Sequence, residues 1–265
     1  MTSVLHIDGA PATVEDLTHV ALVNYGAYTA FRVEDGGVRG LDLHLARLES
    51  SAAELFGEAV GEPRLREFMR GAVGERPSCW LRVSLFAPAL GMREPSWRGR
   101  PRVMIGAFPP PAPLASALRV QVQTYEREAA HLKHAATFGL MRSRRAARDA
   151  GFDDALFVDG NGRISEGSLW TIGFLRGDDV VWPRAPMLAG VTQALIRRGL
   201  ATVGLTDRTQ DVGLSDLDGF DAAFACNSAT PACRITAIDG REFPADPELI
   251  ARLQAAWASN PSDAI

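Results

Sequence analysis

Lysine is almost absent from this sequence of 265 residues. It occurs once, at Lys133, and the other basic residues, out of 28 in all, are arginine. Arginine serves wherever a solvated positive charge is needed, but its guanidinium stays protonated and cannot act as a nucleophilic amine. A drift of composition towards arginine would leave one surface lysine without a role. The alternative is that Lys133 does chemistry that needs a primary amine, such as imine formation with a carbonyl group.

The sequence also lacks the features of several protein classes. Its three cysteines have no CxxC pairing or histidine-rich neighbourhood, so neither a disulfide framework nor a metal site is expected. No run approaches the ~18 apolar residues of a membrane span, and residues 1–10 do not resemble a signal peptide. The net charge of -4 is interspersed, which does not indicate nucleic-acid binding. We therefore expect a cytoplasmic protein with small-molecule substrates and no nucleic-acid or membrane partner.

The length and the 46 % hydrophobic content are sufficient for one large or two modest folded domains. The run Pro109-Pro110-Pro111-Ala112-Pro113 is stiff and cannot form a hydrogen-bonded ladder, which indicates a linker. The sequence thus predicts a small N-terminal domain over residues 1–108, a linker over 109–114 and a larger C-terminal domain over 115–265.

The hydrophobic patterns predict a mixed α/β (α+β) fold. Strands are expected at 4–8, 28–34, 80–86, 103–108, 118–125, 155–159, 169–175, 222–226 and 232–238, and helices at 41–55, 138–149, 191–203 and 247–258. Strands 155–159 and 169–175 are expected to form a hairpin. The strands do not alternate regularly with helices, so the pattern does not favour a closed (β/α)₈ barrel.

Lys133 lies between an expected strand and an expected helix, a position where side chains commonly reach a functional site. One chemistry open to it is attachment of pyridoxal phosphate, which also requires an acid for the pyridine nitrogen and donors for the phosphate. Glu166 is the candidate acid, and the ordinary alternative is a solvated glutamate at a strand edge.

Two segments could bind the phosphate. Gly190-Val191-Thr192 opens a helix, where free N–H groups attract anions. Asn227-Ser228-Ala229-Thr230 follows a strand and supplies small polar residues. Arg47 could neutralise the charge. A helix cap, a simple turn and a surface arginine are the ordinary alternatives for these three features.

Together, the motifs resemble one family. The series reads His44-Leu45-Ala46-Arg47-Leu48, Lys133, Ser165-Glu166-Gly167-Ser168, Leu188-Ala189-Gly190-Val191-Thr192 and Asn227-Ser228-Ala229. In order and spacing, from about Tyr25 to Gly240, it resembles the class IV aminotransferases, which are fold-type IV pyridoxal-phosphate enzymes. They include branched-chain aminotransferases, D-amino-acid aminotransferases and aminodeoxychorismate lyases.

The resemblance implies pyridoxal 5'-phosphate as the cofactor, a two-domain homodimer, and a C-terminal domain resembling a barrel. It implies that Lys133 is the Schiff-base lysine and that Glu166 faces the pyridine nitrogen. For the phosphate it implies Arg47, Val191, Thr192, Ser228 and Ala229, with Val191 and Ala229 acting through backbone N–H groups. For the substrate it implies Arg82 near the carboxylate, and Tyr25 and Thr29 in the pocket wall.

The sequence departs from the family where the substrate would bind. The segment Tyr25 to Thr29 is about two residues shorter than in relatives, and Phe138 stands where branched-chain enzymes have a tyrosine. The segments around Lys133 and after Cys226 look most like the lyase branch. We expect an aminotransferase that moves an amino group between an amino acid and a 2-oxo acid through an imine on Lys133. The alternatives are a lyase that releases pyruvate, a cofactor-free Schiff-base aldolase and a non-catalytic binding relative.

Overall fold

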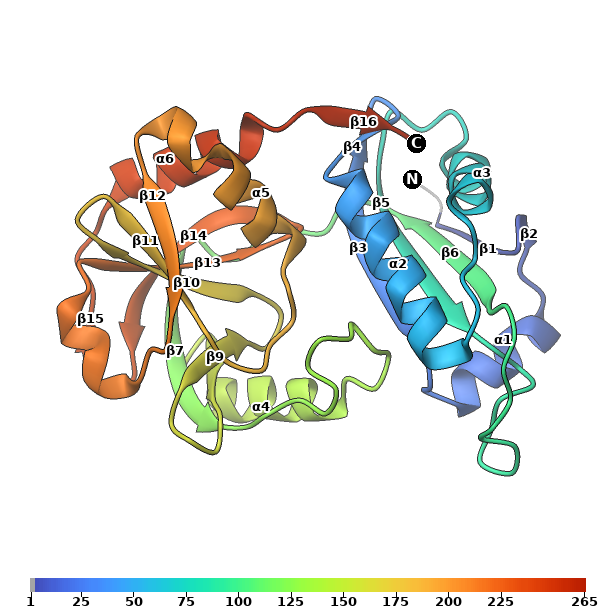
Figure 1. Ribbon diagram of the computed structural model, residues 1–265, viewed down its shortest axis with the longest axis horizontal. Helices are drawn as coiled ribbons and strands as arrows, with labels where there is room; N and C mark the ends of the chain where they lie inside the picture. Colours follow the sequence, from blue (N-terminus) through green and yellow to red (C-terminus); the bar gives the residue numbers. More distant parts are fainter. Residues whose placement is uncertain (1–2) are drawn as a thin grey trace. The chain divides into compact units, whose positions relative to one another are not determined.

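The computed structural model describes residues 3–265, which form two compact units (Figure 1). The first unit contains the residues up to Ala112 together with Leu132–Ala136 and Ser262–Ile265. The second contains Pro113–His131 and Thr137–Pro261. Helices and sheets occur in both units, as the sequence predicted. The segment that carries Lys133 belongs to the first unit, whereas the sequence analysis assigned it to the second, because Leu132 is buried in the core of the first.

The first unit is built on an antiparallel sheet of seven strands. Its strands are β1 (Val4–Ile7), β2 (Ala10–Pro11), β3 (Ala27–Glu34), β4 (Gly37–Arg39), β5 (Ser78–Phe86), β6 (Arg102–Phe108) and β16 (Ser262–Ala264), in the order β16-β4-β3-β5-β6-β1-β2. Its helices are α1 (Val14–Leu22), α2 (Leu41–Phe56) and α3 (Glu62–Val73).

One face of this sheet is buried under helices. Residues alternate between buried and half-buried along β3, and α2 carries a buried stripe that includes Leu41, Leu45 and Leu48. These leucines pack with Phe31 in one core. The same alternation places Tyr28 and Arg82 on the opposite face of the sheet, away from that core.

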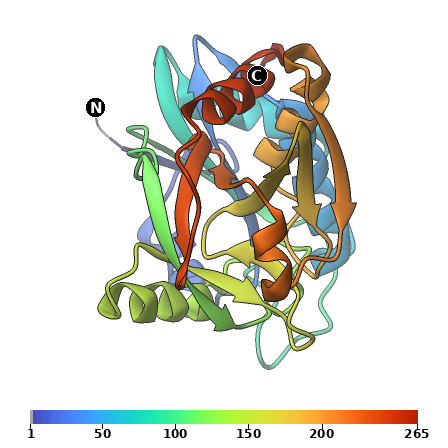
Figure 2. The same ribbon diagram turned by 90° about the vertical axis from the view of Figure 1, so that its left-hand side faces the viewer.

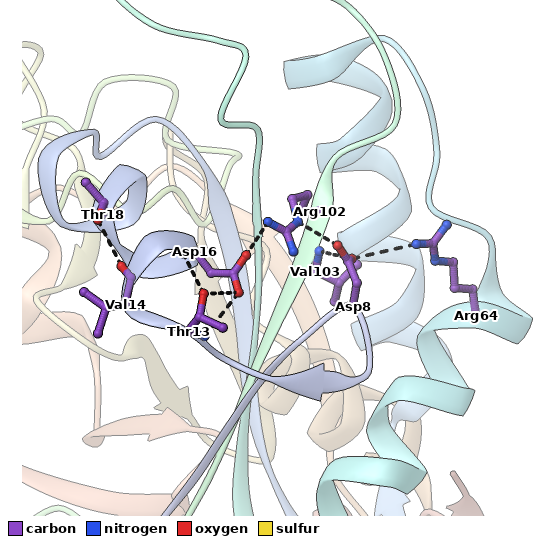
Figure 3. A network of polar contacts seen from close by, with 8 residues as sticks. All are labelled: Asp8, Thr13, Val14, Asp16, Thr18, Arg64, Arg102 and Val103. Atoms are coloured by element: carbon purple, nitrogen blue, oxygen red, sulfur yellow. Dashed lines mark hydrogen bonds and ion pairs between the residues drawn. The ribbon is translucent and has the colours of Figure 1, made fainter.

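A network of charged side chains ties the first residues of this unit together (Figure 3). Arg102 donates from Nε to Asp8 at 2.7 Å and from Nη1 to Asp16 at 2.6 Å. Arg64 also approaches Asp8, at 3.8 Å. The hydrogen bonds from Arg102 and Thr13 hold the pKa of Asp16 below its ordinary value. The network fixes the β1 turn and the start of α1 against β6.

The second unit has a sheet of nine strands. They are β7 (Ala117–Thr124), β8 (Asp154–Val158), β9 (Ile164–Gly167), β10 (Thr171–Arg176), β11 (Asp179–Pro183), β12 (Thr206–Gln210), β13 (Ala222–Asn227), β14 (Thr230–Ile238) and β15 (Arg241–Glu242). Its helices are α4 (Phe138–Asp149), α5 (Val191–Gly199) and α6 (Pro247–Ala258), with 3₁₀ turns at Leu200–Val203 and Leu214–Gly219. Figure 2 shows this unit from a second side.

Six of these strands close into a ring, which accounts for the expected barrel character. The order is β10-β13-β14-β7-β8-β9, and the ring closes because β9 pairs back onto β10 through Glu166 and Thr171. The expected hairpin between 155–159 and 169–175 is wrong. Strand β9 lies between them and pairs with both β8 and β10, since its four buried residues complete the ring.

Helices cover two parts of this unit. Helices α5 and α6 pack on β13 and β14 around Trp182 and Phe224, and α4 packs on β8 around Phe157. Between residues 3 and 265, no helix combines the length and apolar character needed to cross a membrane.

Candidate functional site

Lys133 is held by its own backbone at the start of β3. The carbonyl of Lys133 accepts a hydrogen bond from the N–H of Tyr28 at 2.8 Å, and the N–H of Ala135 donates to Gly26 at 2.8 Å. Leu132 is buried in the core beside it. The position of the only lysine is therefore fixed by main-chain bonds and by a buried neighbour, although the segment is a loop.

Two cationic side chains lie against the ring of Tyr28. The Nζ of Lys133 is 4.9 Å from the ring centroid and the guanidinium carbon of Arg82 is 3.6 Å from it. A cation within ~6 Å of an aromatic centroid is attracted by the negative face of the ring. The structure thus brings together Lys133 and Arg82, both expected from the sequence, through Tyr28, a residue that the sequence analysis did not select.

Arg47 lies on α2, one turn after His44, and the charges of Arg47 and Lys133 both act on His44. His44 is buried, and burial together with the charges of Arg47 and Lys133 lowers its pKa to about 3. His44 is therefore neutral at physiological pH. Its Nδ1 lies 2.6 Å from the hydroxyl of Thr29, and its ring packs on Phe31.

The two candidate pocket residues from the segment Tyr25 to Thr29 differ in exposure. Tyr25 is 45 % exposed and its ring meets the edge of Phe56. Thr29 has an exposed fraction of 0 %, and its hydroxyl is engaged with His44. The geometry therefore gives Thr29 a part in orienting His44, whereas Tyr25 has surface available for a ligand.

In the second unit, Glu166 is a buried carboxylate with a cationic neighbour. Glu166 is 8 % exposed and Arg127 is 7 % exposed, and Oε1 of Glu166 lies 3.5 Å from Nη2 of Arg127. The N–H of Leu188 approaches Oε2 at 3.4 Å. The Nε of Arg127 has no hydrogen-bond partner within the described part of the chain. No periodic pattern or motif marks Arg127, so the sequence analysis missed it.

The start of α5 offers unpaired backbone donors. Gly190 is the N-cap, and no side chain of residues 3–265 caps the first turn. The first N–H groups of a helix have no partner within the helix and attract anions. Gly190 also approaches β10 so closely that a Cβ atom there would lie 2.6 Å from Oγ1 of Thr171. Because Thr171 pairs with Glu166, the start of α5 and the buried acid are brought together.

The turn between β13 and β14 carries Ser228 and Ala229, both half-buried. Thr171 pairs with Cys226, next to this turn, so the turn lies in the same region as Glu166. The N–H of Ala229 donates to Oδ1 of Asn227 at 3.0 Å. That donor, which the family resemblance assigned to a phosphate, is engaged within the turn in this structure, while Ser228 contributes a hydroxyl.

These groups match the chemistry of pyridoxal phosphate. The first unit supplies one primary amine and two arginines, and the second supplies a buried carboxylate, an uncapped helix start with Thr192, and the Ser228 hydroxyl. The close approach at Gly190, where a side chain would collide with Thr171, packs the start of α5 directly against β10. Each unit, taken by itself, therefore holds groups of the kinds that such a cofactor binds, namely an amine and arginines in the first unit and a carboxylate and phosphate donors in the second.

Comparisons with known proteins agree with this interpretation. The family model described as amino-transferase class IV matches residues 26–238. A curated relative, the probable branched-chain-amino-acid aminotransferase of Rickettsia bellii (strain RML369-C), is 25% identical over 241 residues, which are 86% of this chain and 83% of the relative.

Solved structures share the fold. The branched-chain amino acid aminotransferase of Escherichia coli superposes with a TM-score of 0.83 at 21% identity, over 95% of this chain and 92% of that one. A hypothetical aminotransferase from Mycobacterium tuberculosis, in its PLP-bound form, superposes with a TM-score of 0.78 at 22% identity, over 97% and 99%. Both comparisons extend over nearly the whole of residues 3–265.

Proposed function

Because this chain belongs to the class IV aminotransferase family, we propose that it is a pyridoxal-phosphate-dependent enzyme that moves an amino group between an amino acid and a 2-oxo acid. The observation that carries the proposal is the family match over residues 26–238, which includes the only lysine of the chain. The PLP-bound relative from Mycobacterium tuberculosis supports the cofactor.

The proposed cofactor ligands come from the residues described above. Lys133 provides the amine for the aldehyde, and Glu166 provides the carboxylate for the ring nitrogen. Phosphate is bound by Arg47, by Val191 through its backbone N–H, and by the hydroxyls of Thr192 and Ser228; Ala229 joins this set only if its N–H leaves Asn227. When bound, pyridoxal phosphate supplies an electron-accepting ring that stabilises negative charge on a substrate carbon.

The protein contributes positions and protons. The Nζ of Lys133, held near β3 by main-chain bonds, would take up the proton from the α-carbon of the substrate and would deliver it to the cofactor carbon bonded to the substrate nitrogen. Arg127 places a positive charge beside the buried carboxylate of Glu166, with Nη2 of Arg127 3.5 Å from Oε1 of Glu166. Arg82 binds the substrate carboxylate, and Tyr25 lines the pocket. Thr29 is left out of the pocket because its hydroxyl is used by His44.

A spectroscopic experiment tests the proposal. Protein loaded with pyridoxal phosphate is mixed with a panel of amino acids, and we expect its yellow colour to fade as the cofactor becomes its pyridoxamine form. Addition of a 2-oxo acid should restore the colour. Lys133→Ala and Lys133→Arg should abolish turnover, since neither offers a nucleophilic amine. Arg145→Ala, which removes a side chain 85 % exposed, is the matched control.

Two results would count against the transaminase. If no amino acid converts the loaded protein while a chorismate-derived amine releases pyruvate, the lyase alternative is correct. If Lys133→Ala still binds the cofactor covalently and turns over normally, the assignment of Lys133 fails.

The homodimer and the cytoplasmic location stay predictions. Phe138 and Met141 are 78% and 63% exposed on α4, and apolar side chains of this kind favour burial in an interface. Light scattering of the purified protein gives the number of subunits directly, and a monomer under all conditions would contradict the prediction.

A further inference from the structure

Tyr28 and Arg82 are diagonal neighbours on the face of the first sheet that lies opposite α2. Strands β3 and β5 are antiparallel, with Tyr28 opposite Ser84 and Ala30 opposite Arg82. On its other side Arg82 faces Gly106 of β6. The ring of Phe108 lies over Gly106, whereas Ala30 opposite Arg82 is small. The long side chain of Arg82 therefore has room on the β3 side, along the sheet surface towards Tyr28.

The guanidinium of Arg82 is held by the ring and by one hydroxyl. Its central carbon is 3.6 Å from the Tyr28 centroid, and Nε is 3.4 Å from Oγ of Ser84. Within residues 3–265, no carboxylate lies within ion-pair distance of Arg82. A guanidinium without an acidic partner remains able to bind an external carboxylate in a bidentate manner.

Tyr28 is also tied to the reactive amine. Its backbone N–H donates to the carbonyl of Lys133 at 2.8 Å, and its ring lies 4.9 Å from the Nζ of Lys133. The charges of Arg82 and Lys133 cannot be farther apart than the sum of their two distances from one ring. That separation is shorter than the screening length at 0.1 M ionic strength, about 10 Å. Tyr28 therefore sets the separation of the Arg82 and Lys133 charges, through its backbone N–H and through its ring.

We propose that Tyr28 is a positioning residue for substrate binding: its ring fixes the Arg82 guanidinium beside Lys133, so that an α-carboxylate bound by Arg82 brings the neighbouring amine-bearing carbon of an amino acid to the Lys133 amine. The inference rests on the proposed aminotransferase function. It assigns the role to the ring face rather than to the phenol hydroxyl, because both cations interact with the ring.

Steady-state kinetics of the loaded enzyme test this role with three variants. Tyr28→Leu removes the ring, and we expect KM for the amino acid to rise about tenfold while kcat changes less than about threefold, since substrate binding is weakened more than chemistry. Tyr28→Phe keeps the ring and should restore KM to near the wild-type value. Arg32→Ala, which removes a cation from the same strand and the same face, is the control and should leave KM unchanged.

A double-mutant cycle separates positioning from a general loss of structure. Arg82→Met should raise KM at least as much as Tyr28→Leu does. In the Arg82→Met background, Tyr28→Leu should add less than about twofold, because the ring has no guanidinium left to position. Additive effects of the two substitutions, or a Tyr28→Phe variant as impaired as Tyr28→Leu, would overturn the proposal.

A second readout does not depend on turnover. Lysine labelled with ¹³C at Cε gives one side-chain resonance in the full-length protein, because Lys133 is the only lysine. Before cofactor loading, the signal should show the displacement caused by an aromatic ring and should move saturably when propionate, an unreactive carboxylate, is added. Tyr28→Leu should lose the displacement and bind propionate about fivefold more weakly, whereas Tyr28→Phe should retain both.

The two proposals fail in different ways. If the wild-type protein transfers no amino group, the proposed function fails, and the propionate titration still reports on the carboxylate site. If the wild-type protein is an aminotransferase but Tyr28→Leu matches it in KM and in propionate binding, only the role of Tyr28 fails.

Discussion

His44 is a buried histidine whose environment disfavours its charged form. Burial, followed by the nearby charges of Arg47 and Lys133, lowers its pKa to about 3 from the ordinary value of 6.5. The unfolded chain binds a proton at His44 as the pH falls below about 6.5, but the folded chain stays neutral there until about pH 3. Acidification from about pH 6.5 to about pH 3 therefore lowers the free energy of unfolding step by step, because only the unfolded chain takes up a proton at His44 in this range.

The loss of unfolding free energy on acidification should be absent in His44→Asn. This variant keeps a polar atom near the position of Nδ1 and cannot be protonated. Between pH 7 and pH 5 the wild-type protein should lose about 2 kcal/mol of unfolding free energy that the variant does not lose. Urea denaturation at several pH values measures both curves. The other histidines are common to the two proteins and cancel. Parallel curves would show that His44 is not held neutral.

The sequence singled out some site residues but not others. Lys133 was selected because it is the only lysine in the sequence, and Glu166 was selected because it lies in a motif. Arg127 carries no such mark, since it is one of many arginines and only the folded chain places it beside Glu166. The proximity of Tyr28 to Arg82 depends on the pairing of β3 with β5, which the sequence alone did not reveal.

At the scale of elements, the start of α5 depends on the absence of a side chain at Gly190. Its backbone angles, φ -67 and ψ 130, are open to alanine. The obstacle to a larger residue is therefore contact with Oγ1 of Thr171 at 2.6 Å, not backbone strain. A substitution here should move the first turn of α5 and its free N–H groups.

We expect Gly190→Ala to weaken the binding of pyridoxal phosphate about tenfold, since overpacking of this kind costs about 1 to 3 kcal/mol. Adding Thr171→Ala should recover much of the affinity, because it removes the oxygen that the new methyl group meets. Gly160→Ala is the control, as a Cβ there meets nothing within 4 Å. The affinity is measured from the absorbance of the bound cofactor. Unchanged binding in Gly190→Ala would remove this turn from the phosphate site.

Helices with a regular apolar stripe were predicted well, and short buried strands were not. The leucine spacing of α2 gave almost its observed bounds, Leu41–Phe56. Strand β9 has four buried residues, including Ser165 and Glu166, and no alternation of apolar and polar positions. Its structure comes from pairing with β8 and β10, which lie apart in sequence, so local patterns could not reveal it. The spacing of Leu65 and Met69 is helical, but the sequence analysis did not use this signal for α3.

At the scale of the whole molecule, the first unit is assembled from three separate stretches of chain. The last of them, Ser262–Ile265, supplies the edge strand β16 beside β4. Arg66 of α3 donates to the carbonyl of Ala264 at 2.6 Å, and Arg70 donates to that of Ile265 at 3.2 Å. These four residues are therefore part of the first unit although they follow the second in sequence.

Removal of residues 262–265 should lower the unfolding free energy by about 2 kcal/mol, because it deletes the β16 ladder and the acceptors for two arginines. Arg66→Met, which removes one of these bonds and keeps the strand, should cost a smaller part of that amount. Thermal melting of the purified proteins compares them. An unchanged melting temperature after the deletion would mean that β16 adds nothing to the sheet.

The edge strand also bears on how the protein is made. A ribosome synthesises the chain from its N-terminus, so β3, β4 and β5 leave it long before residues 132–136 and 262–265 exist. While translation continues, the β4 edge has no β16 beside it, and its unpaired backbone groups are open to other chains. The nascent first unit therefore depends on residues 262–265, which are synthesised well after the rest of its sheet, to cover that edge.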